Sequence, residues 1–347
     1  MEHRFNYNWT LKDANFTKDK GKVFSCFACG GGSTMGYKLA GFDVIGCNEI
    51  DPKMNKCYVE NHNPKYNYLC DIRDLVKMED LPEELYNLDI LDGSPPCSSF
   101  SIAGSREDAW GVEKKFREGQ KAQVLDTLFF DFIALANKLQ PKVVVAENVK
   151  GLLLGNAIEY VKRIHEEFDK AGYYCEHFLL TGSKMGVPQK RERVFFLCIR
   201  KDIAKPVIKP WGLFGEKPVI KLDFDETPIT CRECNLELAD EIKGCYSQDY
   251  DRMKNGEDKK YFQSLLVELD EVHPTITAGY RDKASPMPAW EKKWLSTSDL
   301  CKIGSYPQDY NFGNCKPQYL IGMSVPPIMT AQVATQIYEQ WLSKINK

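Results

Sequence analysis

Short apolar runs alternate with amphipathic segments through about the first 200 residues. The apolar runs lie at 22–26, 42–47, 88–91, 142–146 and 194–199. Segments compatible with a helix lie between them at 33–39, 124–139 and 158–171. Strands that alternate with helices predict an α/β fold, in which a doubly wound, mostly parallel sheet has helices on both faces.

The pattern changes beyond about residue 200. Prolines interrupt short apolar runs at positions 206, 210, 218 and 228, and a polar stretch covers 248–260. The chain then closes with Pro326-Pro327 and a helix over 328–341, whose apolar residues share one face. A large domain and a smaller, irregular one are therefore expected, because one core rarely grows beyond roughly 250–300 residues.

Composition limits the class of protein. With 43% apolar and 27% charged residues, the 347-residue chain is globular, and no run approaches the ~20 apolar residues that span a bilayer. The N-terminus has no apolar signal segment, so we expect a cytoplasmic protein whose 13 cysteines are reduced. The net charge of -3 gives no general attraction to nucleic acid, but 184–217 carries nine Lys or Arg against three Asp or Glu.

A glycine cluster joins the first strand to the first helix. Cys29-Gly30-Gly31-Gly32 departs from the dinucleotide-binding spacing, so it indicates either a nucleotide-like site or a plain tight turn. Glu49, at the end of the next strand, is placed to accept hydrogen bonds from ribose hydroxyls. Asp71, after the run 66–70, could similarly meet an adenine amino group, or it could only be a helix cap.

Cys97 is the cysteine whose context favours chemistry over structural burial. Two prolines in Ser94-Pro95-Pro96-Cys97 are expected to fix the backbone and hold the thiol at the end of a strand. The segment that follows, over 98–120, is charged and contains several glycines, which is typical of a lid over an active site. A thiol of ordinary pKa is mostly protonated at neutral pH, so a nucleophilic role needs cationic or hydrogen-bonding neighbours. Glu147, at the end of a neighbouring strand, and the run 189–193 are the candidates.

The run 189–193 places Gln189, Arg191 and Arg193 on one face of an extended segment. A solvated charged surface is the ordinary interpretation of such a run. Here it leads directly into the apolar residues 194–197, so we expect its face to be partly buried and its arginines to have anionic partners.

Five motifs in a fixed order together resemble the C5-cytosine-specific DNA methyltransferase family, of the bacterial or phage type. They are Phe27-Ala28-x-x-Gly31-Gly32, Pro95-Pro96-Cys97, Glu147-Asn148-Val149, Gln189-x-Arg191-x-Arg193 and Gly322-x-Ser324-Val325-Pro326. The resemblance runs from about Val23 to the C-terminal helix and leaves out the N-terminal tail and about 201–272.

The resemblance implies a Rossmann-like, S-adenosylmethionine-dependent methyltransferase fold in three parts. A catalytic and cofactor-binding domain over 1–200 would be followed by a target-recognition domain over 201–317, and 318–347 would return to the large domain. The family pattern for the cofactor carries over to Phe27, Gly31, Gly32, Glu49, Ile50, Asp71, Ile72, Pro95, Leu128, Ser324 and Val325.

The resemblance also implies a reaction. The Cys97 thiolate would add to C6 of a cytosine flipped out of duplex DNA, and Glu147 would donate a proton to N3. Arg193 and Arg191, with Gln189 of the same motif, would anchor the base and the active-site carboxylate. The implied partners are double-stranded DNA and a cognate restriction endonuclease. We expect a monomer with no metal and no membrane association.

Three positions depart from the family pattern. Cys29 stands where the first glycine of the loop is usual, Ser98 follows the nucleophile where glutamine is commoner, and Met323 replaces an asparagine. None of these changes the thiol, the glutamate or the arginines, so an active enzyme is expected.

Two other functions and a metal site are disfavoured. A transfer-RNA cytosine-5 methyltransferase of the same fold is disfavoured because that group's Cys-Phe-Thr tripeptide is absent from the small lobe. A non-catalytic DNA-binding relative is disfavoured by the intact Cys97 and Glu147. A zinc site at Cys231-x-x-Cys234, with Cys245 and His273, is disfavoured because the spacing fits no tight pattern.

Overall fold

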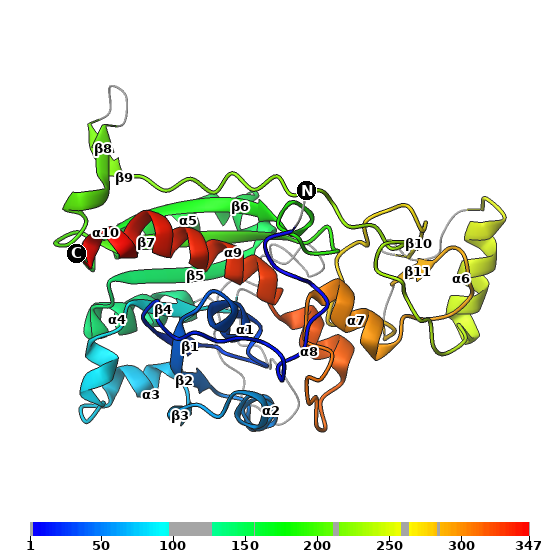
Figure 1. Cartoon of the computed structure of the whole chain (residues 1–347), viewed down its shortest axis with the longest axis horizontal. Helices are drawn as coiled ribbons and strands as arrows, with labels where there is room; N and C mark the ends of the chain where they lie inside the picture. The colour runs from blue at the N-terminus through cyan, green and yellow to red at the C-terminus, as the bar shows by residue number, and fades with distance from the viewer. Residues whose placement is uncertain are drawn as a thin grey trace.

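The computed structural model describes residues 3–96, 127–155, 157–210, 215–257, 264–282 and 285–346. Its centre is a seven-stranded sheet in the order β3-β2-β1-β4-β5-β7-β6 (Figure 1). The strands are β1 (Lys22–Cys26), β2 (Asp43–Glu49), β3 (Tyr66–Leu69), β4 (Ile90–Gly93), β5 (Val143–Val149), β6 (Tyr173–Thr181) and β7 (Glu192–Arg200). The first five are parallel, whereas β7 is antiparallel to both β5 and β6. The predicted mostly parallel sheet is confirmed.

Helices cover both faces of this sheet. They are α1 (Gly32–Leu39), α2 (Pro52–His62), α3 (Ile72–Lys77), α4 (Leu128–Leu139), α5 (Ala157–Lys170) and α9 (Pro327–Ile337). Val144 and Phe196 point into a core formed with α3, α4 and α5, whereas Val145 and Leu197 point into a core formed with α1 and α9. Because both faces are buried, the strands are continuous apolar runs rather than alternating ones.

The C-terminal helix α9 packs directly on α1. Gly36 permits the close approach, since a Cβ there would lie 2.4 Å from the carbonyl oxygen of Pro327. The helix predicted over 328–341 is α-helical only as far as Ile337, and it continues as a π-helical turn over Tyr338–Leu342 and a last turn, α10 (Ser343–Ile345). The end of the chain thus lies against the sheet.

The core on the α1 side extends beyond residue 200. It includes Ala204, Val207, Ile220 and Leu222. These residues flank the short strands β8 (Ile208–Pro210) and β9 (Glu216–Pro218). The chain therefore leaves the sheet-containing core after about residue 222. Short 3-10 turns lie at Glu83–Tyr86, Lys150–Leu153, Gly182–Lys184 and Lys205–Val207.

The following part of the chain lies beyond one end of the sheet (Figure 1). It contains α6 (Gly244–Lys254), β10 (Leu265–Val267), β11 (Pro286–Pro288), α7 (Thr297–Gly304) and α8 (Pro317–Met323). A third core joins α7 and α8 to α1 and α2 through Met35, Met54, Leu300 and Ile321. Within the described ranges, no helix has the length and apolar character needed to cross a membrane.

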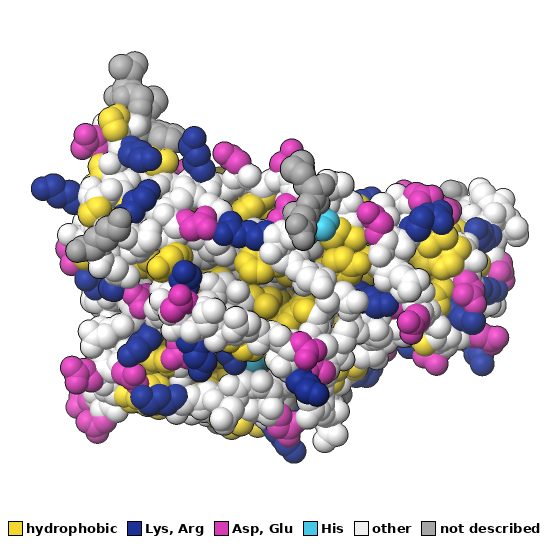
Figure 2. All heavy atoms as spheres, in the orientation of Figure 1, with side chains coloured by type: hydrophobic (Ala, Val, Ile, Leu, Met, Phe, Trp, Pro, Cys, Tyr) yellow, Lys and Arg dark blue, Asp and Glu magenta, His cyan; other side chains and the backbone are white. Residues whose placement is uncertain are grey.

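The basic residues of 184–217 do not form one surface. Lys201 pairs with Asp169 and Lys217 pairs with Glu176, while Arg191 is buried. The β8–β9 hairpin, which carries Lys217, projects from the end of the molecule opposite α6 (Figure 1). On the face of the molecule seen in Figure 2, basic side chains are interspersed with acidic ones. The local excess of positive charge in 184–217 is therefore spread over separate parts of the molecule.

Candidate active site

The predicted site residues gather at the carboxyl ends of the central strands. Gly93 of β4 lies in register between Cys26 of β1 and Ala146 of β5. The glycine loop after β1, the prolines after β4 and Glu147 of β5 therefore emerge at one edge of the sheet, where ligands bind in this class of fold. Cys97 and the segment 98–120 lie outside the described residues.

Glu147 and Arg193 form a buried ion pair between β5 and β7. Arg193 Nε lies 2.8 Å from Glu147 Oε1, and the two side chains are 14% and 9% exposed. Antiparallel pairing places Arg193 opposite Val149, two residues along from Glu147 and hence on the same face. Burial lowers the pKa of Arg193, and the negative charge of Glu147 opposes that change. A guanidinium stays protonated in proteins, so Arg193 is a fixed cation beside the carboxyl group.

Asn148 ties the proline turn to β5. Its Nδ2 donates to the carbonyl oxygen of Pro95 at 3.1 Å, and its Oδ1 accepts from the backbone nitrogen of Val149 at 2.9 Å. The side chain is buried. This contact fixes the backbone two residues before Cys97. No separate role is predicted for Asn148 from the sequence, although a polar residue within a buried strand is a signal for one.

A second ion pair lies beside the first. Lys150 Nζ lies 3.0 and 2.9 Å from the two carboxylate oxygens of Glu192, and both side chains are 37% exposed. Arg193 Nη1 in turn donates to the backbone oxygen of Glu192 at 2.8 Å. The start of β7 is thus held to the turn that follows β5.

Arg191 holds backbone rather than the carboxylate. It is 1% exposed and donates from Nη1 to the oxygen of Ile276 and from Nη2 to the oxygen of Gly322, both at 2.9 Å. The expected anionic partner is in direct contact at Arg193. The hydrogen bonds of Arg191 in the described part of the chain go to carbonyl oxygens, and the negative charge of Glu147 acts on it only electrostatically. Arg191 therefore joins β7 to the chain that returns through α8.

Gln189 has a similar structural position. Its amide oxygen accepts from the backbone nitrogen of Ile276 at 3.1 Å, and its Nε2 donates to the oxygen of Ile303 at 3.2 Å. The side chain is 1% exposed. Gln189 thus joins the 273–277 segment to α7, while Arg191 joins the same segment to α8.

Glu49 ends β2 beside the glycine loop. One carboxylate oxygen accepts from the backbone nitrogen of Cys29 at 2.8 Å, and the other accepts from Ile50 and Asp51 at 3.0 and 2.9 Å. The side chain is 6% exposed, whereas Ile50 is 39% exposed. The backbone therefore fixes the Glu49 carboxylate at the loop, where the sequence predicts contact with ribose.

Asp71 caps α3. Its Oδ1 accepts from the backbone nitrogen and from Nε of Arg73, both at 2.9 Å. These bonds from Arg73 lower the pKa of Asp71. Of the two interpretations that the sequence left open for Asp71, the structure contains the cap. Ile72, which follows, is buried in the core of α3, α4 and α5.

The glycine loop closely contacts two other elements. Gly31 has a φ of 79°, and a Cβ there would lie 2.2 Å from Nε2 of His62. A Cβ at Gly32 would lie 2.5 Å from the oxygen of Val325 and 2.8 Å from Cβ of Ser324. Any side chain at these positions would displace its neighbours. The structure therefore brings Gly31, Gly32, Ser324 and Val325 together, although the two pairs lie about 300 residues apart in the sequence.

The apolar residues predicted to contact the cofactor lie on the α4 side of the loop. Phe27 packs against the core that contains Ile72 and Leu128, and its ring centroid lies 6.4 Å from that of Phe132. Phe27 has a φ of 52°, in the left-handed region. Such conformations persist where the surroundings fix them, and they cluster at binding sites. Pro95 adjoins this region through its bond to Asn148.

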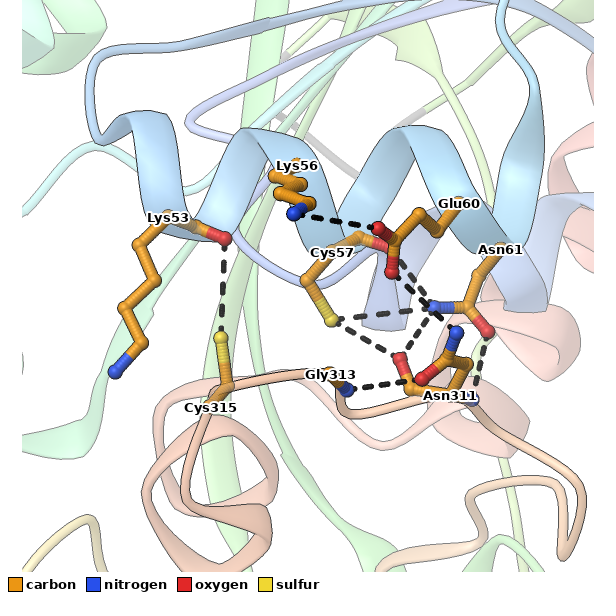
Figure 3. Close-up of polar contacts among 8 residues, drawn as sticks. All are labelled: Lys53, Lys56, Cys57, Glu60, Asn61, Asn311, Gly313 and Cys315. Atoms are coloured by element: carbon orange, nitrogen blue, oxygen red, sulfur yellow. Dashed lines mark hydrogen bonds and ion pairs between the residues drawn. The ribbon is translucent and has the colours of Figure 1, made fainter.

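Residues that the sequence analysis did not single out hold the glycine loop from the other side. The Tyr310 hydroxyl donates to the oxygen of Gly30 at 2.6 Å. Figure 3 shows α2 facing the loop that follows Tyr310, where Asn61 donates to the oxygen of Asn311 at 2.8 Å and Cys57 lies 3.3 Å from the same oxygen. No local pattern predicts these contacts, because 280 residues separate Tyr310 from Gly30.

The alternative zinc site finds no support in the described ranges. Cys231 and Cys234 are buried, whereas Cys245 is exposed. No group of three or more His, Cys, Asp or Glu residues there has an arrangement that could hold a metal ion.

Comparison with known protein families identifies the family to which this site belongs. Residues 21–339 match the model of the C-5 cytosine-specific DNA methylase family. The chain belongs to this family. The Type II methyltransferase M.FnuDI of Fusobacterium nucleatum is 38% identical to this DNA methylase, over 93% of this chain and 96% of that protein. The Type II methyltransferase M.NgoPII of Neisseria gonorrhoeae is 28% identical, over 91% and 95% of the two chains.

The fold of this DNA methylase also occurs among solved structures. The crystal structure of Spodoptera frugiperda DNMT2 matches it with a TM-score of 0.62 at 16% identity, over 94% of this chain and 99% of that one. At this identity the likeness shows the fold alone. The family and enzyme class predicted from the sequence, a DNA (cytosine-5-)-methyltransferase, are confirmed, and the family and fold imply that it uses S-adenosylmethionine.

Proposed function

We propose that this enzyme methylates C5 of a cytosine flipped out of a short recognition sequence in double-stranded DNA, through a covalent bond to Cys97. The observation that carries the proposal is the buried Glu147–Arg193 pair beside the turn that leads to Cys97. We further propose that the enzyme acts in the cytoplasm as a monomer, within a restriction-modification system whose endonuclease cleaves the same sequence.

The residues around the glycine loop fit S-adenosylmethionine. Gly31 and Gly32 leave a backbone surface that no Cβ obstructs, and the Glu49 carboxylate is held at the edge of the loop. When bound, the cofactor supplies the methyl group. In our proposal, Glu49 accepts hydrogen bonds from its ribose. The apolar residues beside the loop that would exclude water from the cofactor are Phe27, Ile50, Ile72, Pro95 and Leu128, while Ser324 and Val325 line the side opposite them.

The chemistry divides between the thiol and the ion pair. Cytosine C5 is a weak nucleophile, so in our proposal the Cys97 thiolate first adds to C6. The Glu147 carboxyl group donates a proton to N3, which relieves the charge that this addition creates. Arg193 stabilises the Glu147 carboxylate that results. The orientation of the Arg193 side chain depends on Glu192, whose backbone oxygen accepts from it and whose carboxylate pairs with Lys150. Arg191 and Gln189 contribute by fixing the chain around the site.

We propose that the chain has the three parts that the sequence indicates: a catalytic domain, a target-recognition domain that starts after about residue 222 rather than at 201 and ends near 317, and a returning C-terminal segment. The part that contains α6, β10 and β11 lies beyond the sheet and supports this division. The core on the α1 side extends to Leu222, which supports a later start for the recognition domain than residue 201.

Methyl transfer to DNA is the direct test. Purified enzyme with labelled S-adenosylmethionine should label duplex DNA, and bisulfite sequencing should locate 5-methylcytosine in one short sequence. Transfer RNA should remain unlabelled. The Cys97→Ala variant should be inactive, whereas Cys175→Ala, which changes a half-buried thiol on the edge strand β6, should be active. Labelled transfer RNA, or an active Cys97→Ala variant, would overturn the proposal.

A further inference from the structure

Residues 3–20, which we call the strap, have no role in the function proposed above. The strap, dark blue in Figure 1, contacts the chain between α7 and α8 before it enters β1. It lies outside the family match, which covers 21–339. Along 3–9 every second residue is half-buried and the residues between them are exposed. Phe5, Tyr7 and Trp9 therefore face the protein.

The strap joins two of the three cores. Phe5 and Tyr7 pack against the core on the α1 side of the sheet, whereas Trp9 and Leu11 pack against the core that joins α7 and α8 to α1 and α2. The Tyr7 hydroxyl also donates to the backbone oxygen of Glu233 at 3.1 Å. Glu233 belongs to the proposed recognition domain, so the strap connects that domain to the sheet.

Trp9 holds the loop 305–309, which lies between α7 and α8. Its Nε1 donates to the backbone oxygen of Ser305 at 3.0 Å, and its own backbone oxygen accepts from the nitrogen of Gln308 at 2.8 Å. Ser305 ends α7 with a φ of 53°, in the left-handed region. Such a conformation persists where the surroundings fix it, and Trp9 is part of those surroundings.

Asp309 extends this contact at the other end of the loop. Its two carboxylate oxygens accept from the backbone nitrogens of Leu11 and Lys12 at 2.6 and 3.0 Å. Both donors belong to the backbone, so the contact depends on the path of the strap rather than on the side chains at positions 11 and 12. The strap therefore fixes the loop at both of its ends.

Two tyrosines beside these contacts reach the residues predicted to bind the cofactor. Tyr310, which follows Asp309, donates to the oxygen of Gly30 at 2.6 Å. Tyr306 donates to Oγ of Ser324, also at 2.6 Å. Both tyrosines are buried, and their ring centroids lie 5.3 Å apart. The strap therefore holds a segment of chain that in turn holds the glycine loop.

We propose that Trp9 is a positioning residue for the cofactor site: it fixes the loop 305–309, which places the Tyr310 hydroxyl on the glycine loop. The inference rests on the role proposed above for the glycine loop in binding S-adenosylmethionine. A glycine loop that is not fixed beforehand must be ordered when the cofactor binds, and this ordering weakens binding. The strap supplies no group to the reaction, so its release should change cofactor affinity and leave kcat at saturating cofactor unchanged.

The experiment is a double-mutant cycle on the Kd for S-adenosylhomocysteine, measured by calorimetry on the purified protein. Trp9→Ala should weaken binding by about fivefold, the same loss as Tyr310→Phe. Because both substitutions act through one contact, the double variant should also bind about fivefold more weakly, whereas independent effects would multiply to about 25-fold. A purely structural role for Trp9 would not produce this coupling.

Phe5→Ala is the matched control. It removes another half-buried aromatic side chain from the strap, but one that packs on the α1 side of the sheet. Phe5→Ala should lower the urea midpoint and leave the Kd unchanged, which separates a loss of stability from a loss of positioning. If Trp9→Ala does not fold, Asp309→Ala, alone and combined with Tyr310→Phe, breaks the same contact from the other side and should give the same cycle.

An unchanged Kd for Trp9→Ala, or a double variant whose two losses multiply, would overturn the inference. An equal loss of affinity in Phe5→Ala would also overturn it, because the effect would then not be specific to the loop 305–309. If the wild type itself failed to bind S-adenosylhomocysteine, the cofactor site in the proposed function would be refuted. Normal wild-type binding with losses that multiply would refute only the role of Trp9.

Discussion

Arg193 Nε, on β7, lies 2.8 Å from Glu147 Oε1, on β5, and both side chains are buried. The two residues belong to motifs about 45 positions apart, and the antiparallel pairing of β5 with β7 brings them together. In the proposed reaction, the Arg193 cation stabilises the Glu147 carboxylate that remains once the proton has been donated.

Removal of the cation should destabilise the fold. Arg193→Ala leaves the Glu147 carboxylate buried without its partner, which typically costs about 3 to 5 kcal/mol of unfolding free energy. Lys150→Ala breaks a pair whose members are both 37% exposed, and it should cost less than about 1 kcal/mol. Urea denaturation of the two variants measures the difference. Equal losses would show that the Glu147–Arg193 pair is not effectively buried.

Asn148 should affect the reaction rate more than cofactor binding. In Asn148→Ala the oxygen of Pro95 loses its donor, and the turn that leads to Cys97 is no longer fixed to β5. Misplacement of a nucleophile by about 1 Å can cost on the order of 100-fold in rate. Single-turnover methylation should therefore slow by roughly 10- to 100-fold, while the Kd for S-adenosylmethionine stays unchanged. Asn87→Ala, at an exposed position, is the control; a changed Kd with an unchanged rate would contradict this role.

Substitution of Tyr310 should affect cofactor binding more than the reaction rate. Tyr310→Phe removes the hydroxyl that donates to the oxygen of Gly30, so the glycine loop loses an anchor of about 1 kcal/mol. Calorimetry should show that S-adenosylmethionine and S-adenosylhomocysteine both bind about fivefold more weakly, with kcat near that of the wild type. Tyr86→Phe, at an exposed tyrosine, should bind both normally. A change in kcat without a change in either Kd would show that Tyr310 does not act through the loop.

Acid should destabilise the protein through two buried histidines. Burial lowers the pKa of His62 to about 3 and that of His273 to about 4, whereas both are near 6.5 in the unfolded chain. As pH falls below about 6.5, the unfolded state therefore takes up protons that the folded state refuses, and stability decreases. Urea midpoints measured between about pH 7 and pH 4.5 should fall, and His62→Gln should reduce the fall.

Protonation of Asp92 should change the stability of the fold in the direction opposite to that of the two histidines as pH falls. Its pKa is raised to about 7 in the folded state, so between about pH 4 and 7 the folded protein holds a proton that the unfolded chain has lost. That contribution to stability is complete below about pH 4 and disappears as pH rises through 7. Asp92→Asn should therefore be more stable than wild type at pH 8, and it should lose stability more steeply on acidification. The same urea midpoints test this, and a shallower loss would be inconsistent with the burial of a protonated Asp92.

The parts of the fold that sequence could predict are those in which the signal is local. The strand, glycine loop and helix around Gly31 are contiguous, and the Ser94-Pro95-Pro96-Cys97 motif has its prolines beside the thiol. The edge strand β6 was missed because its residues are mostly half-buried and alternate with polar ones, as in Cys175-Glu176-His177. A strand covered less fully than its neighbours does not need a continuous apolar run.

The parts that sequence could not predict depend on which groups meet after folding. A buried arginine requires acceptors, but the sequence does not distinguish a carboxylate, as for Arg193, from the carbonyl oxygens that Arg191 contacts. The contact of Tyr310 with Gly30 likewise follows from tertiary packing. For the same reason, the basic excess within 184–217 gave no information about where its side chains would lie.

The proposed covalent bond to Cys97 is tested most directly by trapping. The enzyme should be incubated with S-adenosylmethionine and duplex DNA that carries 5-fluorocytosine at the methylated position, then digested and analysed by mass spectrometry. Fluorine at C5 cannot leave as a proton does, so the bond to sulfur should persist. We predict one nucleotide adduct, on the peptide that contains Cys97, and none with Cys97→Ala. An adduct on another cysteine, or an adduct formed by Cys97→Ala, would contradict the account.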